Sequence, residues 1–369
     1  MKTVEQVPEY IRSLIPYEPG KPIEEVEREY GISNSVKLAS NENPLGPSPK
    51  ALAAMRSKLE QLNLYPDGDC FYLRQALSKK LGVAAETLIF GNGSNEIIEL
   101  AARTFLRPGD EAVMAEQAFV VYQLIVQAVG ARSRAVPLKN FTHDLPALAA
   151  AVSTRTRMMF LANPNNPTGT IFRRAEWERF LGQLSPDILL IVDEAYFEYV
   201  RDADYPDSLR YHTHERAIIT LRTFSKLYGL AGLRIGYGVA PKELISLMQR
   251  VRQPFNVNAP AQWAALAALD DAEHVKRSLD ANRRGLEFLQ KEFTRLRLEF
   301  VPSQANFILV RVGRGQEVFQ RLLKQGVIVR PTTGYRFPEH VRVTIGTMEE
   351  NRKFIDALEK VIKAINERL

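Results

Sequence analysis

Cysteine is almost absent from this sequence. Cys70 is the only cysteine among 369 residues, which excludes an intramolecular disulfide and is typical of a reducing compartment. No motif of a nucleophilic cysteine surrounds it. We therefore interpret Cys70 as a small buried apolar residue.

Long apolar runs are also missing. Runs such as residues 188–192 are far shorter than the stretch that a membrane-spanning helix needs. Residues 1–22 contain charges and prolines where a signal peptide would have an uninterrupted apolar segment. These features predict a cytoplasmic protein with no membrane partner.

Charge of one sign is not clustered. The chain has 49 Lys and Arg against 43 Asp and Glu, a formal net charge of +6, and the two signs alternate along most of its length. Short basic pairs such as Arg132 with Arg134 do not form the surface that nucleic-acid binding requires. We expect no nucleic-acid partner.

Histidine is scarce, and only His212 and His214 lie close together among the five. A His-x-His pair without further ligands nearby is weak evidence for zinc. We expect ordinary surface histidines and no bound metal.

Short β-like runs alternate with helical patterns between residues 85 and 250. This alternation is typical of a doubly wound α/β domain built on a mostly parallel sheet. The expected helices include Glu96–Phe105 and Arg174–Leu184. The expected strands are Leu88–Phe90, Ala112–Ala115, Met158–Ala162, Ile188–Val192, Ile218–Leu221 and Ile235–Val239.

The C-terminal part of the chain has a different pattern. A long helical stretch over residues 259–298 is followed by three expected strands, Phe307–Arg311, Val327–Val329 and Val341–Ile345. The last segment has one apolar helical stripe, and Thr347 with Glu350 forms a capping-box signature at its start. This pattern predicts a smaller α+β domain.

The length of the chain exceeds what one hydrophobic core usually organises, so we expect two domains. The segment 250–258, which contains Pro254, is the predicted boundary. We expect an N-terminal arm with part of the small domain at residues 1–40, a large domain at 41–255 and a small C-terminal domain at 256–369.

Four polar or glycine-rich segments follow predicted strands: residues 91–95 (GNGSN), 163–169 (NPNNPTG), 193–196 (DEAY) and 223–226 (TFSK). Ligands of open α/β sheets bind beyond the carboxyl ends of the strands, so these segments mark the expected site. The first is as consistent with a tight turn as with a phosphate site at a helix N-terminus. The second fits either a plain loop or a cis bond at Asn166–Pro167.

Asp193 and Lys226 carry the charges in these segments. Asp193 ends a buried strand, so its carboxylate needs a partner: a helix N-terminus, a salt bridge or a protonated pyridine nitrogen. Lys226 follows two hydroxyls, Thr223 and Ser225, and an amine desolvated there has a lowered pKa and can form an imine with an aldehyde. Most lysines are only solvated, so the companions of Lys226 decide its interpretation.

The order and spacing of NPNNPTG (163–169), DEAY (193–196) and SKLYGLAGLRIGY (225–237) resemble the fold-type-I aminotransferases, which depend on pyridoxal phosphate (PLP). The resemblance covers nearly the whole chain. It implies a large doubly wound α/β domain with a mostly parallel sheet and a smaller α+β domain. It also implies that Lys226 is the Schiff-base lysine and the base that moves the substrate Cα proton.

The resemblance implies roles for the neighbouring residues. Asp193 matches the partner of the pyridine nitrogen, and Asn166 and Tyr196 match the residues that bind the phenolic oxygen of the cofactor. Phe119 matches the ring-stacking aromatic, which is often tyrosine in relatives. The residues that match the phosphate site are Ser94, Asn95, Thr223, Ser225 and Arg234. Tyr65, in LYPDG, matches a tyrosine that reaches the phosphate from the other subunit, which implies a homodimer with shared active sites.

Within the family, the sequence resembles the histidinol-phosphate aminotransferase subgroup in LIPYEPGKP, in KLASNENPLGPSP and in Arg330 of GVIVRP. Arg330 is expected to bind the phosphate of L-histidinol phosphate and the side-chain carboxylate of glutamate. Arg342 matches the arginine that binds the α-carboxylate of an amino donor. The alternative interpretation of Arg342 is an ordinary arginine on the surface of a strand. Tyr17 is expected to line the pocket. The implied reaction belongs to histidine biosynthesis. It converts L-histidinol phosphate and 2-oxoglutarate to imidazole acetol phosphate and L-glutamate.

Two other activities fit the same scaffold. An aromatic amino-acid aminotransferase requires only that the pocket accept a benzyl group in place of an imidazole. Threonine-phosphate decarboxylase would also need an arginine for phosphate. A regulator without enzymatic activity is disfavoured, because residues 1–40 are proline-rich and not basic and leave no room for a helix-turn-helix.

Overall fold

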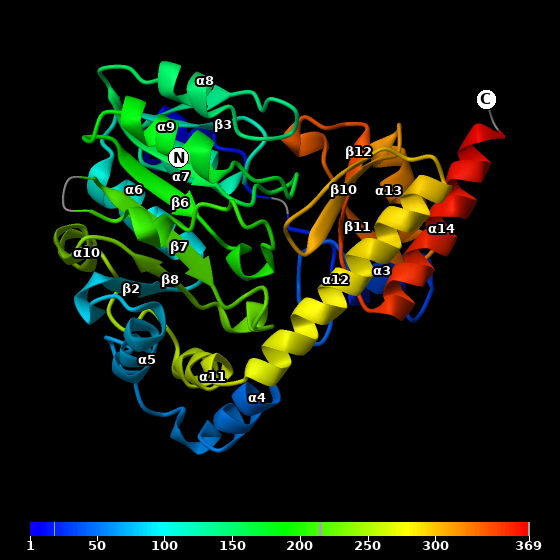
Figure 1. The fold of residues 1–369 in the computed structure, drawn as a ribbon, viewed down its shortest axis with the longest axis horizontal. Coiled ribbons are helices and arrows are strands. Elements are labelled where there is room, and N and C mark those ends of the chain that lie inside the picture. The colour runs from blue at the N-terminus through cyan, green and yellow to red at the C-terminus, as the bar shows by residue number, and fades with distance from the viewer. Residues whose placement is uncertain (18, 214–215, 368–369) are drawn as a thin grey trace.

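The computed structural model describes residues 1–17, 19–213 and 216–367, and two sheets organise them (Figure 1). In spatial order, the seven strands of the large sheet are β2 (Leu88–Gly91), β8 (Gly236–Val239), β7 (Ile218–Thr223), β6 (Leu189–Asp193), β5 (Thr156–Ala162), β3 (Glu111–Ala115) and β4 (Arg132–Val136). The five strands of the small sheet are β1 (Val36–Leu38), β11 (Val327–Pro331), β12 (His340–Thr344), β10 (Phe307–Arg311) and β9 (Phe300–Val301).

The large sheet is mostly parallel, as predicted. The strands β4, β3, β5, β6 and β7 pair in parallel, and only β8 runs antiparallel to both of its neighbours. Every strand predicted between residues 85 and 250 is present, with shifts of one or two residues at its ends. The additional strand β4 is mostly exposed at the sheet edge, which explains its weak apolar signal.

Helices cover both faces of this sheet. Alternate side chains of β6 show the arrangement: Ile191 packs with α6 (Ser94–Phe105), α7 (Val121–Ala128) and α10 (Lys242–Gln249). Leu190 and Val192 pack with α8 (Leu145–Ala150) and α9 (Arg174–Gln183) on the opposite face. Both faces of the central strands are therefore buried, which confirms the doubly wound α/β architecture.

A further helical layer packs near β2 and β8. It consists of α4 (Pro49–Arg56), α5 (Phe71–Leu81) and α11 (Ala259–Leu269), whose apolar residues share one core with Leu88 and Val239. Cys70 lies in this core and is buried, as predicted, and burial raises the pKa of its thiol to about 12. The predicted boundary at residues 250–258 stays a prediction, and it lies just before α11.

The small sheet packs against three long helices, α12 (Ala272–Arg295), α13 (Gly315–Leu323) and α14 (Met348–Asn366). Its strand β1 comes from the N-terminal segment and pairs in parallel with β11, and α3 (Ile23–Tyr30) packs near it. The capping box at Thr347 and Glu350 is present at the start of α14, as predicted. The C-terminal part therefore has the expected α+β character.

The single helical stretch predicted over residues 259–298 is wrong, because the chain forms two helices there. α11 ends at Leu269 and α12 begins at Ala272. Asp271 is the N-cap of α12, where its side chain accepts hydrogen bonds from the His274 backbone and from Ser48 Oγ. An N-capping aspartate favours a new helix start over continuation of the first helix.

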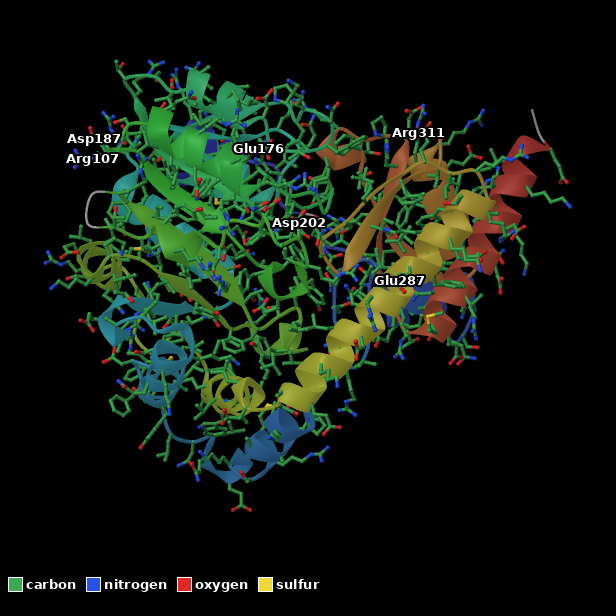
Figure 2. All side chains as sticks on the ribbon, viewed as in Figure 1. Arg107, Glu176, Asp187, Asp202, Glu287 and Arg311 are labelled. Carbon is green, nitrogen blue, oxygen red and sulfur yellow. The ribbon has the colours of Figure 1, made fainter. Side chains whose placement is uncertain are left out.

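The remaining elements are short. They are α1 (Lys2–Glu5), α2 (Glu9–Arg12) and the 3₁₀ turns η1 (Leu59–Gln61), η2 (Ala85–Thr87), η3 (Phe197–Tyr199), η4 (Ser208–Tyr211), η5 (Ala231–Leu233) and η6 (Thr333–Tyr335). Charged side chains such as Arg107, Asp187 and Glu287 lie exposed on the outside of both lobes (Figure 2). Within the described ranges, no helix has the length and apolar character needed to cross a membrane.

Candidate active site

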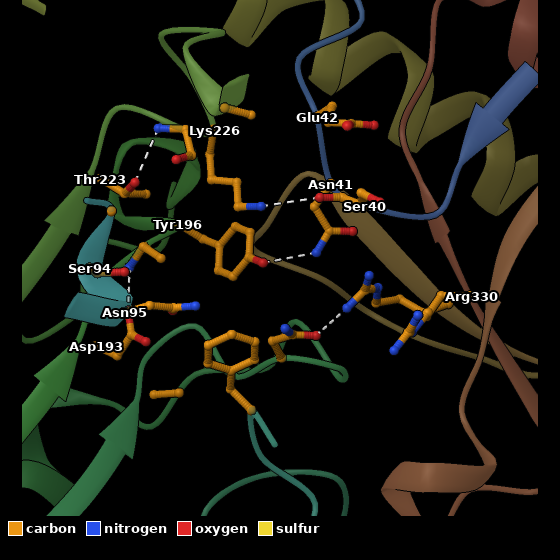
Figure 3. A pocket seen from close by; sticks show the side chains of 18 of the residues that line it. Ser40, Asn41, Glu42, Ser94, Asn95, Asp193, Tyr196, Thr223, Lys226 and Arg330 are labelled. Atoms are coloured by element: carbon orange, nitrogen blue, oxygen red, sulfur yellow. Dashed lines mark hydrogen bonds between the residues drawn. The ribbon is translucent and has the colours of Figure 1, made fainter. Parts of the chain in front are cut away.

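A cavity of about 270 Å³ lies where the carboxyl ends of the large-sheet strands face the small sheet (Figure 3). All the predicted site residues except Tyr65 line it: Tyr17, Ser94, Asn95, Phe119, Asn166, Asp193, Tyr196, Thr223, Ser225, Lys226, Arg234, Arg330 and Arg342. The fold thus brings together side chains that are more than 300 residues apart in the sequence.

Tyr65 lies outside this cavity. Its side chain is 82% exposed, and its ring stacks on Phe255 with 4.9 Å between the ring centroids. Within one chain it cannot contribute to the site. A role in a neighbouring subunit's site, as the resemblance implies, is compatible with this exposure.

Lys226 projects into the cavity from the loop that follows β7. Lys226 is partly buried, and its Nζ donates a hydrogen bond to the Ser40 carbonyl oxygen at 3.1 Å. Burial lowers the pKa of Lys226 to about 8, and the nearby charge of Arg342 adds to this effect. A larger fraction of the amine is therefore neutral at physiological pH than in a solvated lysine.

Asp193 ends β6 and is 7% exposed. Its carboxylate accepts hydrogen bonds from Tyr122 Oη at 2.7 Å and from the Ala195 backbone at 3.1 Å. Burial raises the pKa of this carboxyl group, which means that the anion is costly without a cation nearby. Among the described ion pairs, none includes Asp193, and its carboxylate lines the cavity instead.

The segment GNGSN forms both a tight turn and an exposed helix start. Gly93 is the N-cap of α6 with φ 72°, and no side chain caps the first turn, which begins with Ser94 and Asn95. A Cβ atom added to Gly93 would lie 2.7 Å from Arg234 Nη2. The backbone N–H groups, the guanidinium and the hydroxyls of Thr223 and Ser225 therefore surround one place suited to a phosphate.

Arg342 is almost fully buried, which excludes the alternative of a surface strand arginine. Its guanidinium donates hydrogen bonds to Asn166 Oδ1 and, at 2.6 Å, to the Ala39 carbonyl oxygen. Its Nε is buried and has no hydrogen-bond partner among the described residues. Asn166 belongs to the NPNNPTG segment (163–169), which contains a cis peptide bond at Asn163–Pro164. The possible cis bond predicted from the sequence was at Asn166–Pro167 instead.

Arg330 lies directly opposite Arg342 across the β11–β12 pair. Both side chains line the cavity, and the Arg330 guanidinium also lies over the ring of Tyr17, 5.6 Å from its centroid. Like charges opposite each other in a sheet are unfavourable, so this arrangement favours an anionic ligand between them.

Sequence reasoning missed several residues of the cavity, among them Ser40, Asn41, Tyr122 and Tyr335. Tyr122 lies three residues after Phe119, near the start of α7, so helical spacing was a usable signal. Ser40 and Asn41 belong to a segment whose only signal was its resemblance to relatives. Tyr335 has no motif, and only the packing of the small lobe places it here.

Two histidine predictions are wrong. His143 and His274 are buried rather than on the surface, and burial lowers the pKa of each. His212 is partly buried and hydrogen-bonds Thr220, whereas His214 lies outside the described residues. Across the ranges that the structure describes, no three His, Cys, Asp or Glu side chains form a group that could hold a metal ion.

Comparisons with known proteins agree with this geometry. Residues 33–358 match the family model "Aminotransferase class I and II". The chain is 51% identical to histidinol-phosphate aminotransferase of Moorella thermoacetica over 98% of this chain and 94% of that protein. It is also 51% identical to histidinol-phosphate aminotransferase 1 of Nitrosococcus oceani, over 96% of each chain.

A solved structure has the same fold. Histidinol-phosphate aminotransferase from Sinorhizobium meliloti, in complex with pyridoxal-5'-phosphate, superimposes with a TM-score of 0.89 at 26% identity, over 98% of both chains. This likeness confirms the predicted fold class of a PLP-dependent fold-type-I transferase. Fold, cavity residues and sequence similarity lead to one conclusion: the chain belongs to the class I and II aminotransferases.

Proposed function

We propose that this aminotransferase transfers the amino group of L-histidinol phosphate to 2-oxoglutarate, with PLP bound in the cavity around Lys226. The observation that carries the proposal is the pair of arginines, Arg330 and Arg342, which face each other across two strands and line the same cavity. Relatives at 51% identity that are named histidinol-phosphate aminotransferase support the choice of substrate.

The residues present fit the cofactor. The carboxylate of Asp193 is buried and forms no ion pair with any described residue, although the charge of Lys226 acts on it from a greater distance. A protonated pyridine nitrogen would supply a direct cationic partner. The turn at Gly93 and the start of α6 offer N–H groups for its phosphate beside Arg234. The ring of Phe119 lines the cavity and offers a flat face for stacking.

When bound, PLP would supply an aldehyde for the amino group and a pyridine ring that withdraws electrons from the substrate Cα. Lys226 Nζ, with its lowered pKa, would accept the proton of this Cα and hold it for return. Asp193 would keep the pyridine nitrogen protonated, and Asn166 and Tyr196 would hydrogen-bond the phenolic oxygen.

Arg342 binds the α-carboxylate of glutamate, because its side chain lines the cavity and each terminal nitrogen carries a second N–H besides the one that it donates to Asn166 or to Ala39. Arg330 binds the second anion, which is the phosphate of histidinol phosphate or the side-chain carboxylate of glutamate. One guanidinium can serve both because its donors match carboxylate and phosphate oxygens alike. Tyr17 holds Arg330 from the N-terminal segment.

We also propose a homodimer with shared active sites. Large apolar side chains lie exposed around the same surface hollow as Tyr65: Leu62, Leu64 and Phe255. A second copy of the chain would cover this surface and bring its own Tyr65 to the phosphate site.

Half-reaction rates with L-histidinol phosphate, phenylalanine and threonine phosphate test the substrate. We expect histidinol phosphate to react fastest, and a preference for phenylalanine would instead identify an aromatic aminotransferase. Arg330→Ala should weaken the binding of histidinol phosphate and of glutamate, by roughly tenfold to a hundredfold each, because each substrate loses a charge-assisted hydrogen bond. An effect of this variant on neither substrate would refute the assignment of Arg330.

A further inference from the structure

The segment Ala39–Asn41 follows β1 and enters the cavity from the small sheet (Figure 3). Each of its residues binds a different group of the candidate site. The Ala39 and Ser40 carbonyl oxygens accept hydrogen bonds from Arg342 and Lys226, at 2.6 and 3.1 Å. Asn41 Nδ2 donates to Tyr196 Oη at 2.8 Å. Of these three contacts, only the one from Asn41 involves a side chain of the segment, so it is the only one that a substitution within the segment can remove directly.

Asn41 is held in place by the small lobe. It is 1% exposed, and its φ of 57° lies in the left-handed region, which asparagine tolerates better than most residues. Its backbone N–H donates to Thr344 Oγ1 at 2.9 Å, and its carbonyl oxygen accepts from Asn306 Nδ2 at 2.9 Å. The position of its side-chain amide is therefore determined by Thr344 of β12 and by Asn306, the residue before β10.

The hydrogen bonds around Asn41 have defined directions. Thr344 Oγ1 accepts from the Asn41 backbone N–H and, because an amide oxygen can only accept, donates its own proton to Asn41 Oδ1 at 3.1 Å. The amide nitrogen lies on the other side, 2.8 Å from Tyr196 Oη, and since Nδ2 can only donate, the Tyr196 oxygen accepts. The hydroxyl proton of Tyr196 is then left for another acceptor, and none is present among the described residues.

We infer that Asn41 is a positioning residue, which directs the hydroxyl proton of Tyr196 toward the phenolic oxygen of the cofactor. This inference rests on the proposed function, in which Tyr196 contacts that oxygen. Tyr196 is buried and lines the cavity, and burial raises its pKa to about 12, so it keeps the proton that it must donate. The neutral amide of Asn41 orients that proton without changing the charge of the site.

The inference predicts a spectroscopic effect. The nitrogen that would join Lys226 to the cofactor holds a proton beside the phenolic oxygen, and the negative charge of that oxygen stabilises this proton. A hydrogen bond donated to the phenolic oxygen reduces its negative charge and so weakens the stabilisation. Loss of the bond should raise the pH midpoint at which the visible absorption of the bound cofactor changes. The expected rise is about one pH unit, the size typical of one hydrogen bond to a charged group.

The experiment is a spectrophotometric pH titration of the cofactor-loaded enzyme and three variants: Asn41→Gly, Tyr196→Phe and the double variant. Glycine accepts a φ of 57°, so Asn41→Gly removes the amide without straining the backbone. Both single variants should raise the midpoint, and the double variant should match Tyr196→Phe. Asn34→Gly is the matched control, because Asn34 has φ 59° but lies exposed outside the cavity.

Asn41→Asp keeps the size of the side chain and reverses the bond. A carboxylate can only accept, so it takes the proton of Tyr196 and should raise the midpoint more in the wild-type background than in Tyr196→Phe. A midpoint unchanged by Asn41→Gly, or raised equally with and without the Tyr196 hydroxyl, overturns the inference. If Tyr196→Phe has no effect, its proposed contact with the cofactor is wrong and the inference fails with it. Absence of any visible absorption in the wild type would refute the proposed cofactor itself.

Discussion

At the scale of the single residue, Lys226 has two properties that a catalytic amine needs: shielding from solvent and a lowered pKa. It is partly buried inside the cavity, and its lowered pKa comes from desolvation and from the charge of Arg342 rather than from a covalent partner. Lys226→Ala should abolish the visible absorption of bound PLP and reduce turnover by at least about a thousandfold, because it removes both the attachment point and the general base. The measurements are an absorption spectrum and a steady-state assay. Lys242→Ala, at an exposed lysine at the start of α10, is the control, and activity retained by Lys226→Ala would contradict the assignment.

The same lysine makes a pH-dependent contribution to the stability of the cofactor-free protein. The pKa of Lys226 is about 8 in the folded state and 10.5 for a solvated lysine, so between these values the unfolded chain binds more protons. The cost of burying the charge is complete below about pH 8 and disappears as the pH rises toward 10.5. Lys226→Met should therefore stabilise the apo-protein by roughly 2–3 kcal/mol at pH 7 and by little at pH 10.5. Denaturant unfolding of both proteins at the two pH values measures this, and a pH-independent difference would contradict it.

At the scale of the element, the start of α6 combines a turn, a helix N-terminus and a close approach of Arg234. Gly93→Ala places a Cβ atom 2.7 Å from Arg234 Nη2 at a φ of 72°. We expect weaker PLP binding by roughly tenfold or more, because the guanidinium has to move from the phosphate site. Equilibrium binding of PLP to the apo-protein measures the effect.

Gly82→Ala is the control for this substitution. Gly82 has φ 67°, and a Cβ atom there would meet nothing within 4 Å. Gly82→Ala should lose about 1–2 kcal/mol of stability from its left-handed conformation (ψ 31°). Gly93→Ala should lose more, because at ψ 172° the backbone lies in a region that only glycine adopts readily. Only Gly93→Ala should lose affinity for PLP. Equal PLP affinities of the two variants would contradict a role for the contact between position 93 and Arg234 in phosphate binding.

At the scale of the whole molecule, the proposed dimer places Tyr65 of each subunit in the partner's site. Mixing Tyr65→Ala subunits with Lys226→Ala subunits should restore activity, because each heterodimer contains one site with both residues intact. Random association predicts about a quarter of the wild-type activity per site. The assay is the transamination rate before and after subunit exchange, with the Tyr65→Ala homodimer as background. A rate that does not rise above this background would argue against shared sites.

The sequence predicted the large sheet well because its buried strands are continuous apolar runs and its helices are amphipathic. Two of its errors have local causes. The N-cap at Asp271 divides an apolar stretch that reads as one helix, and exposed β4 lacks an apolar signal. His143 and His274 are buried by tertiary packing, which no local pattern encodes.

Motif order alone was enough to select Lys226, Asp193, Asn166 and Arg234, since their chemistry depends on residue type and on their position after strands. What the tertiary structure decided is how these groups are held. The hydrogen bond from Tyr122 to Asp193 and the contacts of residues 39–41 join segments distant in the chain. Local sequence determines which elements form, whereas hydrogen-bond direction and burial depend on atoms brought together only by packing between elements. For that reason the presence of Lys226 in the cavity was predictable, whereas the hydrogen bond from Asn41 to Tyr196 was not.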